Sequence, residues 1–142
     1  MKMMNFNKIM KQHLIKLICL LIFSVFFLTG EAKAQSLFSN VRSALKAGSS
    51  KELAKYFHDT IELNINGESD NYSNVHAEIY LKDFFKKYEP VDFEYIHQGS
   101  SNEGLQYAIG SYSYAGGNFK LLIRTKSFKG VDKIYILDFV KE

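Results

Sequence analysis

The sequence predicts an α+β domain in which a curved antiparallel sheet of about six strands packs against three helices. Two observations support this prediction. Residues 91–140 divide into four segments rich in β-branched and aromatic residues, and glycine-containing turns separate them. Residues 37–88 alternate between apolar patterns typical of helices and of strands. The expected order of elements is α-α-β-β-α-β-β-β-β, and no repeat or linker interrupts it.

The first 34 residues are organised like a secretory signal peptide. Residues 1–16 carry four lysines and no acidic residue, residues 17–28 are apolar with one exception, and Ala32-Lys33-Ala34 places small residues where a signal peptidase reads them. We therefore predict cleavage near Ala34–Gln35. The predicted organisation is a signal peptide over residues 1–34 and a single domain over residues 35–142, secreted or periplasmic.

A permanent membrane anchor is the competing interpretation of this segment. Lys16 and Glu31 leave 14 uncharged residues between them, fewer than the roughly 20 that a helix needs to span a bilayer. Cys19 lies inside the apolar run and not at its end, which disfavours a lipid anchor. We expect no stable membrane anchor after cleavage and no cysteine in the mature chain, which then depends on packing for its stability.

The net charge of the chain depends on the same segment. The full sequence has 18 Lys and Arg and 15 Asp and Glu. Five of these basic residues and one acidic residue belong to residues 1–34, so the mature chain keeps 13 basic and 14 acidic residues and a net charge of −1. The basicity of the full chain is therefore no argument for a nucleic acid or an anionic membrane as a partner.

Two short helices are predicted at the start of the domain. Residues 37–47 have apolar residues at the spacing of one helix face, and Gly48 follows where a left-handed cap is expected. Ser49 and Glu52 match a reciprocal capping box, so a second helix should start there and run to about Phe57.

A hairpin and a longer helix should follow. Residues 60–65 alternate between apolar and polar residues, and Asn66-Gly67 is a strong hairpin turn. Residues 68–72 then form a short polar edge strand. Ser73 or Asn74 can cap a helix that runs to about Tyr88, with an apolar face towards the sheet.

The last four strands are predicted at residues 91–98, 105–114, 119–128 and 131–140. Strict alternation predicts that His97 shares a face with Phe93 and Tyr95, and that Tyr135 shares a face with Leu137 and Phe139. Gly110 in mid-strand predicts a kink or bulge that curls the sheet. Both faces of the later strands carry apolar residues, so one face should cover the helices and the other is too apolar to be wholly solvated.

Several stretches resemble a secreted bacterial family, domain of unknown function 4783, within the nuclear transport factor two-like, or cystatin-like, cone fold. The stretches are residues 44–48, 51–57, 81–85, 96–101 and 107–110. The resemblance covers essentially the whole mature chain. It implies a curved sheet around helices with a cavity at the wide end, and it implies export. It implies no activity, because none of these motifs is catalytic.

The resemblance to the cone fold also suggests where chemistry would be sought. Enzymes of this fold use a carboxylate or a His–Asp pair as base and a tyrosine as hydrogen-bond donor. The candidates in this sequence are Asp138, His97, Tyr56, Tyr95 and Tyr107. Asp138 stands among apolar neighbours, and burial would raise its pKa. The structural alternatives are an Asp138 on the outer face or near a frayed terminus, and a His97 that only holds the adjacent turn.

The sequence has no motif for metal-dependent, nucleophilic or phosphate-binding chemistry. The histidines after residue 34 are not spaced as metal ligands and have no cysteine partner, so we expect no metal site. There is no nucleophile elbow and no glycine-rich phosphate loop. No cofactor is expected.

Two functions remain as hypotheses. The first is a non-enzymatic exported module that binds a small apolar ligand or a protein partner through its cavity or its outer sheet face, including a homodimer through that face. Its ligand-binding candidates are Tyr56, Tyr95, His97 and Tyr107. The second is a small periplasmic isomerase or hydrolase that uses Asp138 or His97. The second hypothesis requires these two side chains to meet within hydrogen-bond reach in an enclosed pocket.

Overall fold

The computed structural model describes residues 2–26, 29–101 and 103–142, and the chain separates into two compact units, Met1–Ser36 and Leu37–Glu142. The first unit contains helix α1 (Lys2–Phe26), whose residues 5–22 are exposed. Within the described ranges, no helix has the length and apolar character needed to cross a membrane. Residues 27–28, at the end of the predicted apolar run, and Asn102, in the predicted turn at 100–104, lie outside the described residues.

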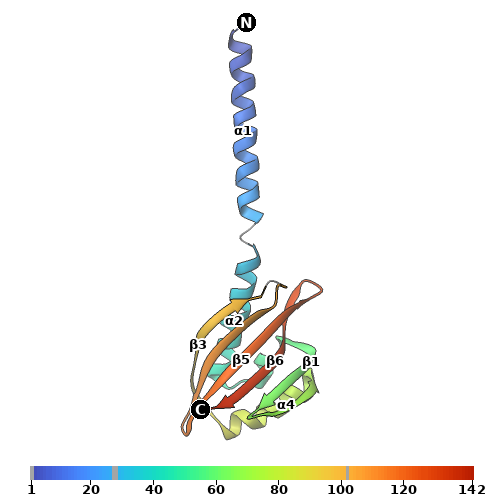
Figure 1. Ribbon diagram of the computed structural model, residues 1–142, viewed down its shortest axis with the longest axis vertical. Helices are drawn as coiled ribbons and strands as arrows, with labels where there is room; N and C mark the ends of the chain where they lie inside the picture. Colours follow the sequence, from blue (N-terminus) through green and yellow to red (C-terminus); the bar gives the residue numbers. More distant parts are fainter. Residues whose placement is uncertain (1, 27–28, 102) are drawn as a thin grey trace. The chain divides into compact units, whose positions relative to one another are not determined.

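The second unit follows the predicted order of elements (Figure 1). Its helices are α2, which begins before the unit, α3 and α4, and its strands are β1 to β6. Their bounds are α2 Thr29–Ala47, α3 Ser50–Ala54, β1 Phe57–Ile65, β2 Glu68–Ser73, α4 Asn74–Lys87, β3 Pro90–Ser100, β4 Gln106–Tyr114, β5 Gly117–Phe128 and β6 Val131–Lys141.

The six strands form one sheet in the order β2-β1-β6-β5-β4-β3. The predicted α+β class and the meander from β3 to β6 are confirmed. The prediction of an antiparallel sheet is wrong for one pair, because β1 and β6 run parallel. The chain reaches this arrangement because α4 carries it from β2, at one edge, to β3, at the other edge, and the meander then returns until β6 lies beside β1.

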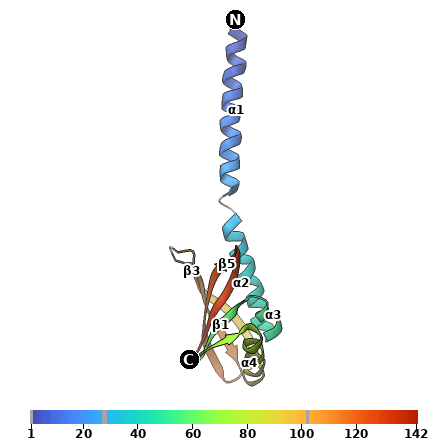
Figure 2. The same cartoon turned by 90° about the vertical axis from the view of Figure 1, so that its right-hand side faces the viewer.

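Helices α2, α3 and α4 lie on one face of the curved sheet (Figure 2). The core lies between them and the sheet, because each strand directs alternate side chains towards the helices. The helices contribute their apolar stripe, and the sheet contributes its inner face, which includes Ile61, Leu63, Phe93, Tyr112, Phe119, Leu121, Ile123, Ile134, Leu137 and Phe139. The other face of the sheet, here called the outer face, has no helix over it in the described unit.

The junction between α2 and α3 differs from the prediction in one detail. Gly48 has a φ of 61° and ends α2, as predicted. The Ser49 side chain accepts a hydrogen bond from the Glu52 amide, which caps α3. Glu52 does not complete the box, because the Ser49 amide already donates to the Ala44 carbonyl. The Glu52 carboxylate instead accepts from the Lys55 ammonium at 2.7 and 2.8 Å.

Helix α3 is also shorter than predicted. It ends at Ala54, and Phe57 already belongs to β1. The chain joins the sheet at this point: the Tyr56 carbonyl accepts a hydrogen bond from the Ile134 amide, and Phe57 pairs with Ile134. A short helix has few internal hydrogen bonds, so the hydrogen bonds to β6 stabilise these residues more than another turn of helix would.

The β1–β2 hairpin and the start of α4 agree with the prediction. Asn66 and Gly67 have φ values of 54° and 86°, as a tight hairpin turn requires. Strand β2 is an edge strand with mostly exposed polar residues. The Ser73 hydroxyl accepts a hydrogen bond from the His76 amide and caps α4.

Two bulges decide which residues face the core. On β3, Tyr95 pairs with Gly110 and His97 with Ile109, so Ile96 has no partner in the register. A kink or bulge was predicted at Gly110 itself, but the extra residue, Ile96, is on the neighbouring strand β3, opposite Gly110. The extra residue moves His97 to the outer face, so the prediction that it shares a face with Phe93 is wrong.

The second bulge lies between β5 and β6. Arg124 pairs with Ile136 and Thr125 with Ile134, so Tyr135 is the extra residue. The predicted phase of β6 is therefore wrong at this point. Ile134 is buried with Leu137, and Tyr135 is only half-buried.

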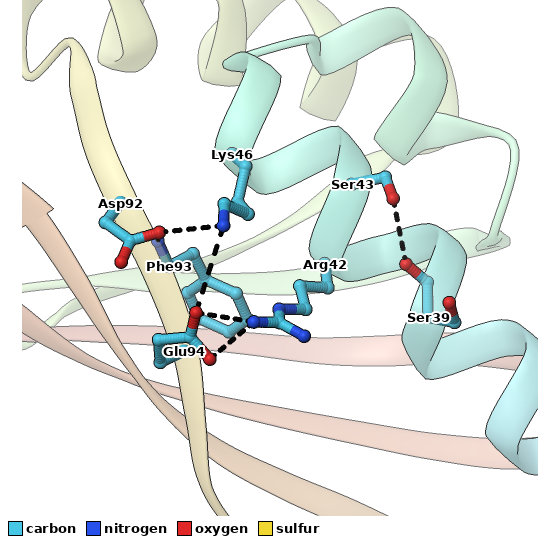
Figure 3. Close-up of polar contacts among 7 residues, drawn as sticks. All are labelled: Ser39, Arg42, Ser43, Lys46, Asp92, Phe93 and Glu94. Atoms are coloured by element: carbon cyan, nitrogen blue, oxygen red, sulfur yellow. Dashed lines mark hydrogen bonds and ion pairs between the residues drawn. The ribbon is translucent and has the colours of Figure 1, made fainter.

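Ionic contacts join α2 to the edge strand β3 (Figure 3). One Arg42 nitrogen donates to both Glu94 carboxylate oxygens, at 2.5 and 2.6 Å, and the Lys46 ammonium lies 3.1 Å from an Asp92 oxygen. The Lys46 hydrogen bond, together with the Phe93 amide, lowers the pKa of Asp92. These contacts place the positive side chains of α2 against the negative side chains of β3.

Candidate functional site

The space between the sheet and α4 is filled by aromatic rings. The Phe84 ring centroid lies 4.6 Å from that of Phe139, 5.3 Å from that of Phe119 and 5.0 Å from that of Tyr88. The Tyr112 ring packs in this cluster, and its hydroxyl donates a hydrogen bond to the Tyr88 carbonyl. This part of the concave side is therefore a packed core.

Two of the predicted ligand-binding tyrosines belong to this packed side. Tyr95 donates its hydroxyl to the Phe38 carbonyl at 2.7 Å, and its ring packs against Phe38 and Phe93. Burial raises the pKa of the Tyr95 phenol. Tyr56 is half-buried against the core, where its carbonyl accepts from the Ile134 amide. Both tyrosines act as links between the helices and the sheet.

The structure brings His97 and Tyr107 together on the outer face. The His97 Nε2 and the Tyr107 hydroxyl lie 3.0 Å apart, and the Tyr107 ring lies close over Gly99, where a Cβ would approach its oxygen to 2.6 Å. His97 is exposed. The pair joins β3 to β4 beside the turn, which is the structural alternative considered for His97.

Asp138 also lies on the outer face, in the middle of the sheet. It pairs with Leu122 on β5 and with Asn64 on β1. Within the described part of the chain, its Oδ1 atom is shielded from solvent and has no hydrogen-bond partner. Burial raises the pKa of Asp138, Glu62 raises it further, and Arg124 opposes the shift.

His97 and Asp138 occupy the same row across the sheet but do not meet. The row runs from His97 through Ile109 and Leu122 to Asp138. Three strand spacings of about 4.8 Å place their backbones about 14 Å apart. A direct proton transfer needs hydrogen-bond distance, so this arrangement does not form the acid–base pair that the enzyme hypothesis requires.

The residues between them form an apolar patch on the outer face, defined by Ile109, Leu122 and Ile136. Ile109 pairs with Leu122, and Ile136 lies diagonally across from Leu122 on β6. All three side chains are half-buried. Asp138 and Arg124 border this patch, and Arg124 is exposed and forms no hydrogen bond or ion pair within the described ranges.

Sequence reasoning missed Arg124 and the patch as a unit. A signal was available, because Leu122 and Arg124 are two residues apart on one strand and must share a face. The regular β4–β5 register places Ile109 beside Leu122, whereas the β5–β6 register that places Ile136 and Asp138 beside them includes a bulge. Alternation within single strands does not contain that information.

Comparison with known proteins identifies relatives of this domain. The family model DUF4783, a domain of unknown function, matches residues 38–139. A DUF4783 family protein from Bacteroides ovatus is similar, with 31% identity, a TM-score of 0.69, and coverage of 72% of this chain and 93% of that one. A DUF4783 family protein from Bacteroides uniformis has 29% identity and the same TM-score, over 73% of this chain and 95% of its own. No curated protein matches.

More distant structures share the fold alone. An NTF-2 like protein of unknown function from Burkholderia xenovorans has 16% identity and a TM-score of 0.61, over 79% of this chain and 84% of its own. A de novo designed protein with a curved β-sheet has 13% identity and a TM-score of 0.62, over 75% of this chain and 98% of its own. These similarities support the nuclear transport factor two-like fold that the sequence predicted.

Proposed function

Because the chain belongs to the DUF4783 family, a family of unknown function, we propose a role from its geometry: an exported, non-enzymatic binding module that uses the outer face of its sheet. The observation that carries the proposal is the apolar patch of Ile109, Leu122 and Ile136, bordered by a carboxylate oxygen and a guanidinium that have no hydrogen-bond or ion-pair partner among residues 2–26, 29–101 and 103–142. A sheet face of this kind favours a protein partner, because an apolar patch on an outer surface suits another protein surface, whereas small molecules bind in concave sites.

The partner that fits this face is a second copy of the chain. A two-fold axis would set Arg124 of one copy against Asp138 of the other, and the same contact would form twice. The apolar patches would meet between the two ion pairs. Charge complementarity of this kind supports a self-complementary face, since each copy has Asp138 and Arg124 at the border of the patch, and neither Asp138 Oδ1 nor the Arg124 guanidinium has a hydrogen-bond or ion-pair partner among the described residues.

Analytical ultracentrifugation of the purified chain tests this proposal. The wild type should associate reversibly with concentration, and Leu122→Lys and Arg124→Glu should each weaken association by at least tenfold, because a desolvated charge would lack its partner. The double variant Arg124→Glu/Asp138→Lys exchanges the two charges and should recover part of the association.

A charge reversal on the helical side of the domain provides the control. Lys51 is exposed on α3, and Lys51→Glu should leave association unchanged. A wild-type chain that stays monomeric at every concentration, or equal effects of the Lys51 and Arg124 variants, would contradict the proposal.

A further inference from the structure

A second feature of the domain lies apart from the outer face. An open groove of about 420 Å³ runs between α4 and the β1–β2 hairpin. Its lining residues are Ile65, Asn66, Glu68, Tyr80, Asp83, Phe84, Lys87 and Tyr88. The volume is within the range of small-molecule sites. The candidate site residues predicted from the sequence do not line this groove.

The groove has an aromatic and apolar wall. Tyr80 is 39% exposed, and its ring centroid lies 5.4 Å from that of Tyr72. Ile65, Tyr80 and Glu68 also line an adjacent hollow of about 240 Å³, so the two hollows meet at these residues. An apolar body of several carbon atoms therefore has two ring faces and an aliphatic side chain to contact.

The charges around the wall are mainly negative. Glu68, Asp70 and Asp83 line the two hollows, and none of them forms an ion pair in the part of the chain that the structure describes. The one lysine of the lining, Lys87, lies with its ammonium 5.2 Å from the centroid of the Tyr88 ring. Burial raises the pKa of the Tyr72 phenol, and Asp70, Tyr80 and Glu68 raise it further.

We propose that this groove binds a small amphipathic amine, with its apolar body against Tyr80 and Ile65 and its ammonium group between Glu68 and Asp83. An aromatic wall beside carboxylates is the combination that recognises organic cations, because ring faces and carboxylates both attract positive charge. An anion of the same shape would face two unpaired carboxylates and have only Lys87 to offset them. The selectivity for charge is the distinguishing property of this site.

Three indole compounds of similar shape test the proposal directly. Tryptamine carries an ammonium, tryptophol a neutral hydroxyl and indole-3-acetate a carboxylate. The chain contains no tryptophan. Excitation at the red edge of the indole absorption band therefore excites the ligand and not the protein. The fluorescence anisotropy of each indole then reports its binding to the intact protein. Tryptamine should bind most tightly, tryptophol about fivefold more weakly and indole-3-acetate more weakly still.

Variants of the groove locate the binding. Asp83→Asn and Glu68→Gln should each weaken tryptamine binding about fivefold and leave tryptophol binding nearly unchanged, whereas Tyr80→Ala should weaken both. Glu78→Gln is the matched control, because Glu78 is on the same helix but does not line either hollow. Thermal unfolding of the Tyr80→Ala variant, whose side chain is partly exposed, checks that the domain is still folded.

Three results would contradict the proposed amine site. Equal binding of the three indoles, no binding of tryptamine, or an equal effect of the Glu78 and Asp83 variants would overturn the inference. The outer-face variants Leu122→Lys and Arg124→Glu should leave tryptamine binding unchanged, so failure of the groove and failure of the proposed self-association are distinguishable.

Discussion

Gly110 shows how a single residue position shapes the sheet. A Cβ at this position would approach the Phe93 ring to 2.4 Å and the Glu94 carbonyl oxygen to 2.9 Å. The Phe93 side chain is fully buried and occupies the space above the glycine. The bulge at Ile96 lies opposite the same residue. The missing side chain and the extra residue together allow β3 to curve around the core.

We predict that Gly110→Ala destabilises the domain by about 1–3 kcal/mol, because the new methyl group overpacks the Phe93 ring and its backbone neighbour cannot move away freely. Urea denaturation measures the free energy of unfolding. Phe93→Leu should cost less stability in the Gly110→Ala background than it does in the wild type. Ser111→Ala, on the outer face of the same strand, is the control, and a Gly110 variant as stable as that control would refute this account.

Asp138 is a residue whose protonation should affect stability. Its carboxyl has a raised pKa in the folded domain, mainly through burial. The folded state therefore binds the proton more tightly than the unfolded state does. The free energy of unfolding should fall as the pH rises from the ordinary value of 3.8 through the raised pKa, and the loss persists at neutral pH.

Asp138→Asn should remove this dependence. We predict that the variant is more stable than the wild type at neutral pH and equally stable well below the ordinary carboxyl pKa, where the wild-type side chain is protonated in both states. Denaturant midpoints at the two pH values, measured on dilute protein to exclude self-association, provide the comparison. Glu103→Gln, an exposed change near a turn, controls for general charge effects, and a less stable Asn variant at neutral pH would contradict the prediction.

At the scale of elements, α2 and β3 are joined by both apolar and ionic contacts. Phe38 of α2 packs against Tyr95, and the Phe38 carbonyl accepts a hydrogen bond from the Tyr95 hydroxyl. The Arg42–Glu94 pair lies nearer the solvent, with side-chain exposures of 42% and 54%. Water screens the ion pair, so the buried aromatic contact should contribute more to holding the helix in place.

A double-mutant cycle checks this ranking. We predict a coupling energy between Arg42→Ala and Glu94→Ala below about 1 kcal/mol, which decreases in high salt. Tyr95→Phe should cost about 1 kcal/mol, because it removes the hydrogen bond from the Tyr95 hydroxyl to the Phe38 carbonyl, and its cost should not depend on salt. An Arg42–Glu94 coupling well above the cost of Tyr95→Phe would reverse the ranking. Tyr107→Phe, at an exposed hydrogen bond, is the control and should cost less.

At the scale of the whole molecule, the organisation of the first 34 residues leads to a prediction about processing. If the proposed export occurs, the mature protein begins at Gln35, since Ala32 and Ala34 supply the small residues that the peptidase requires. Intact-mass measurement of the protein from the native host checks the new terminus. Ala34→Phe should retain the leader, and Lys33→Gln, between the two small residues, should not. A mature chain that keeps Met1 would contradict the prediction.

Much of the architecture was accessible from the sequence because its signals are local. Asn66-Gly67 and Gly48 adopt positive φ at little cost, Ser73 caps the helix that follows it, and alternation within a strand needs only neighbouring residues. The candidate site was less accessible. Tyr56 and Tyr95 were predicted to line a cavity, and the structure places them in packed contacts, because side chains from distant elements fill the space around them.

The order of the elements, their turns, most of their caps and the curvature near Gly110 follow from residues close together in the sequence. Three features depend instead on contacts between distant segments: β1 lies parallel to β6, His97 and Tyr135 leave the core side, and Asp138 and Arg124 flank one apolar patch. The physical reason is the range of the interactions. Turns and caps depend on residues a few positions apart, whereas a one-residue bulge changes the face of every later side chain and depends on how strands distant in the sequence pair.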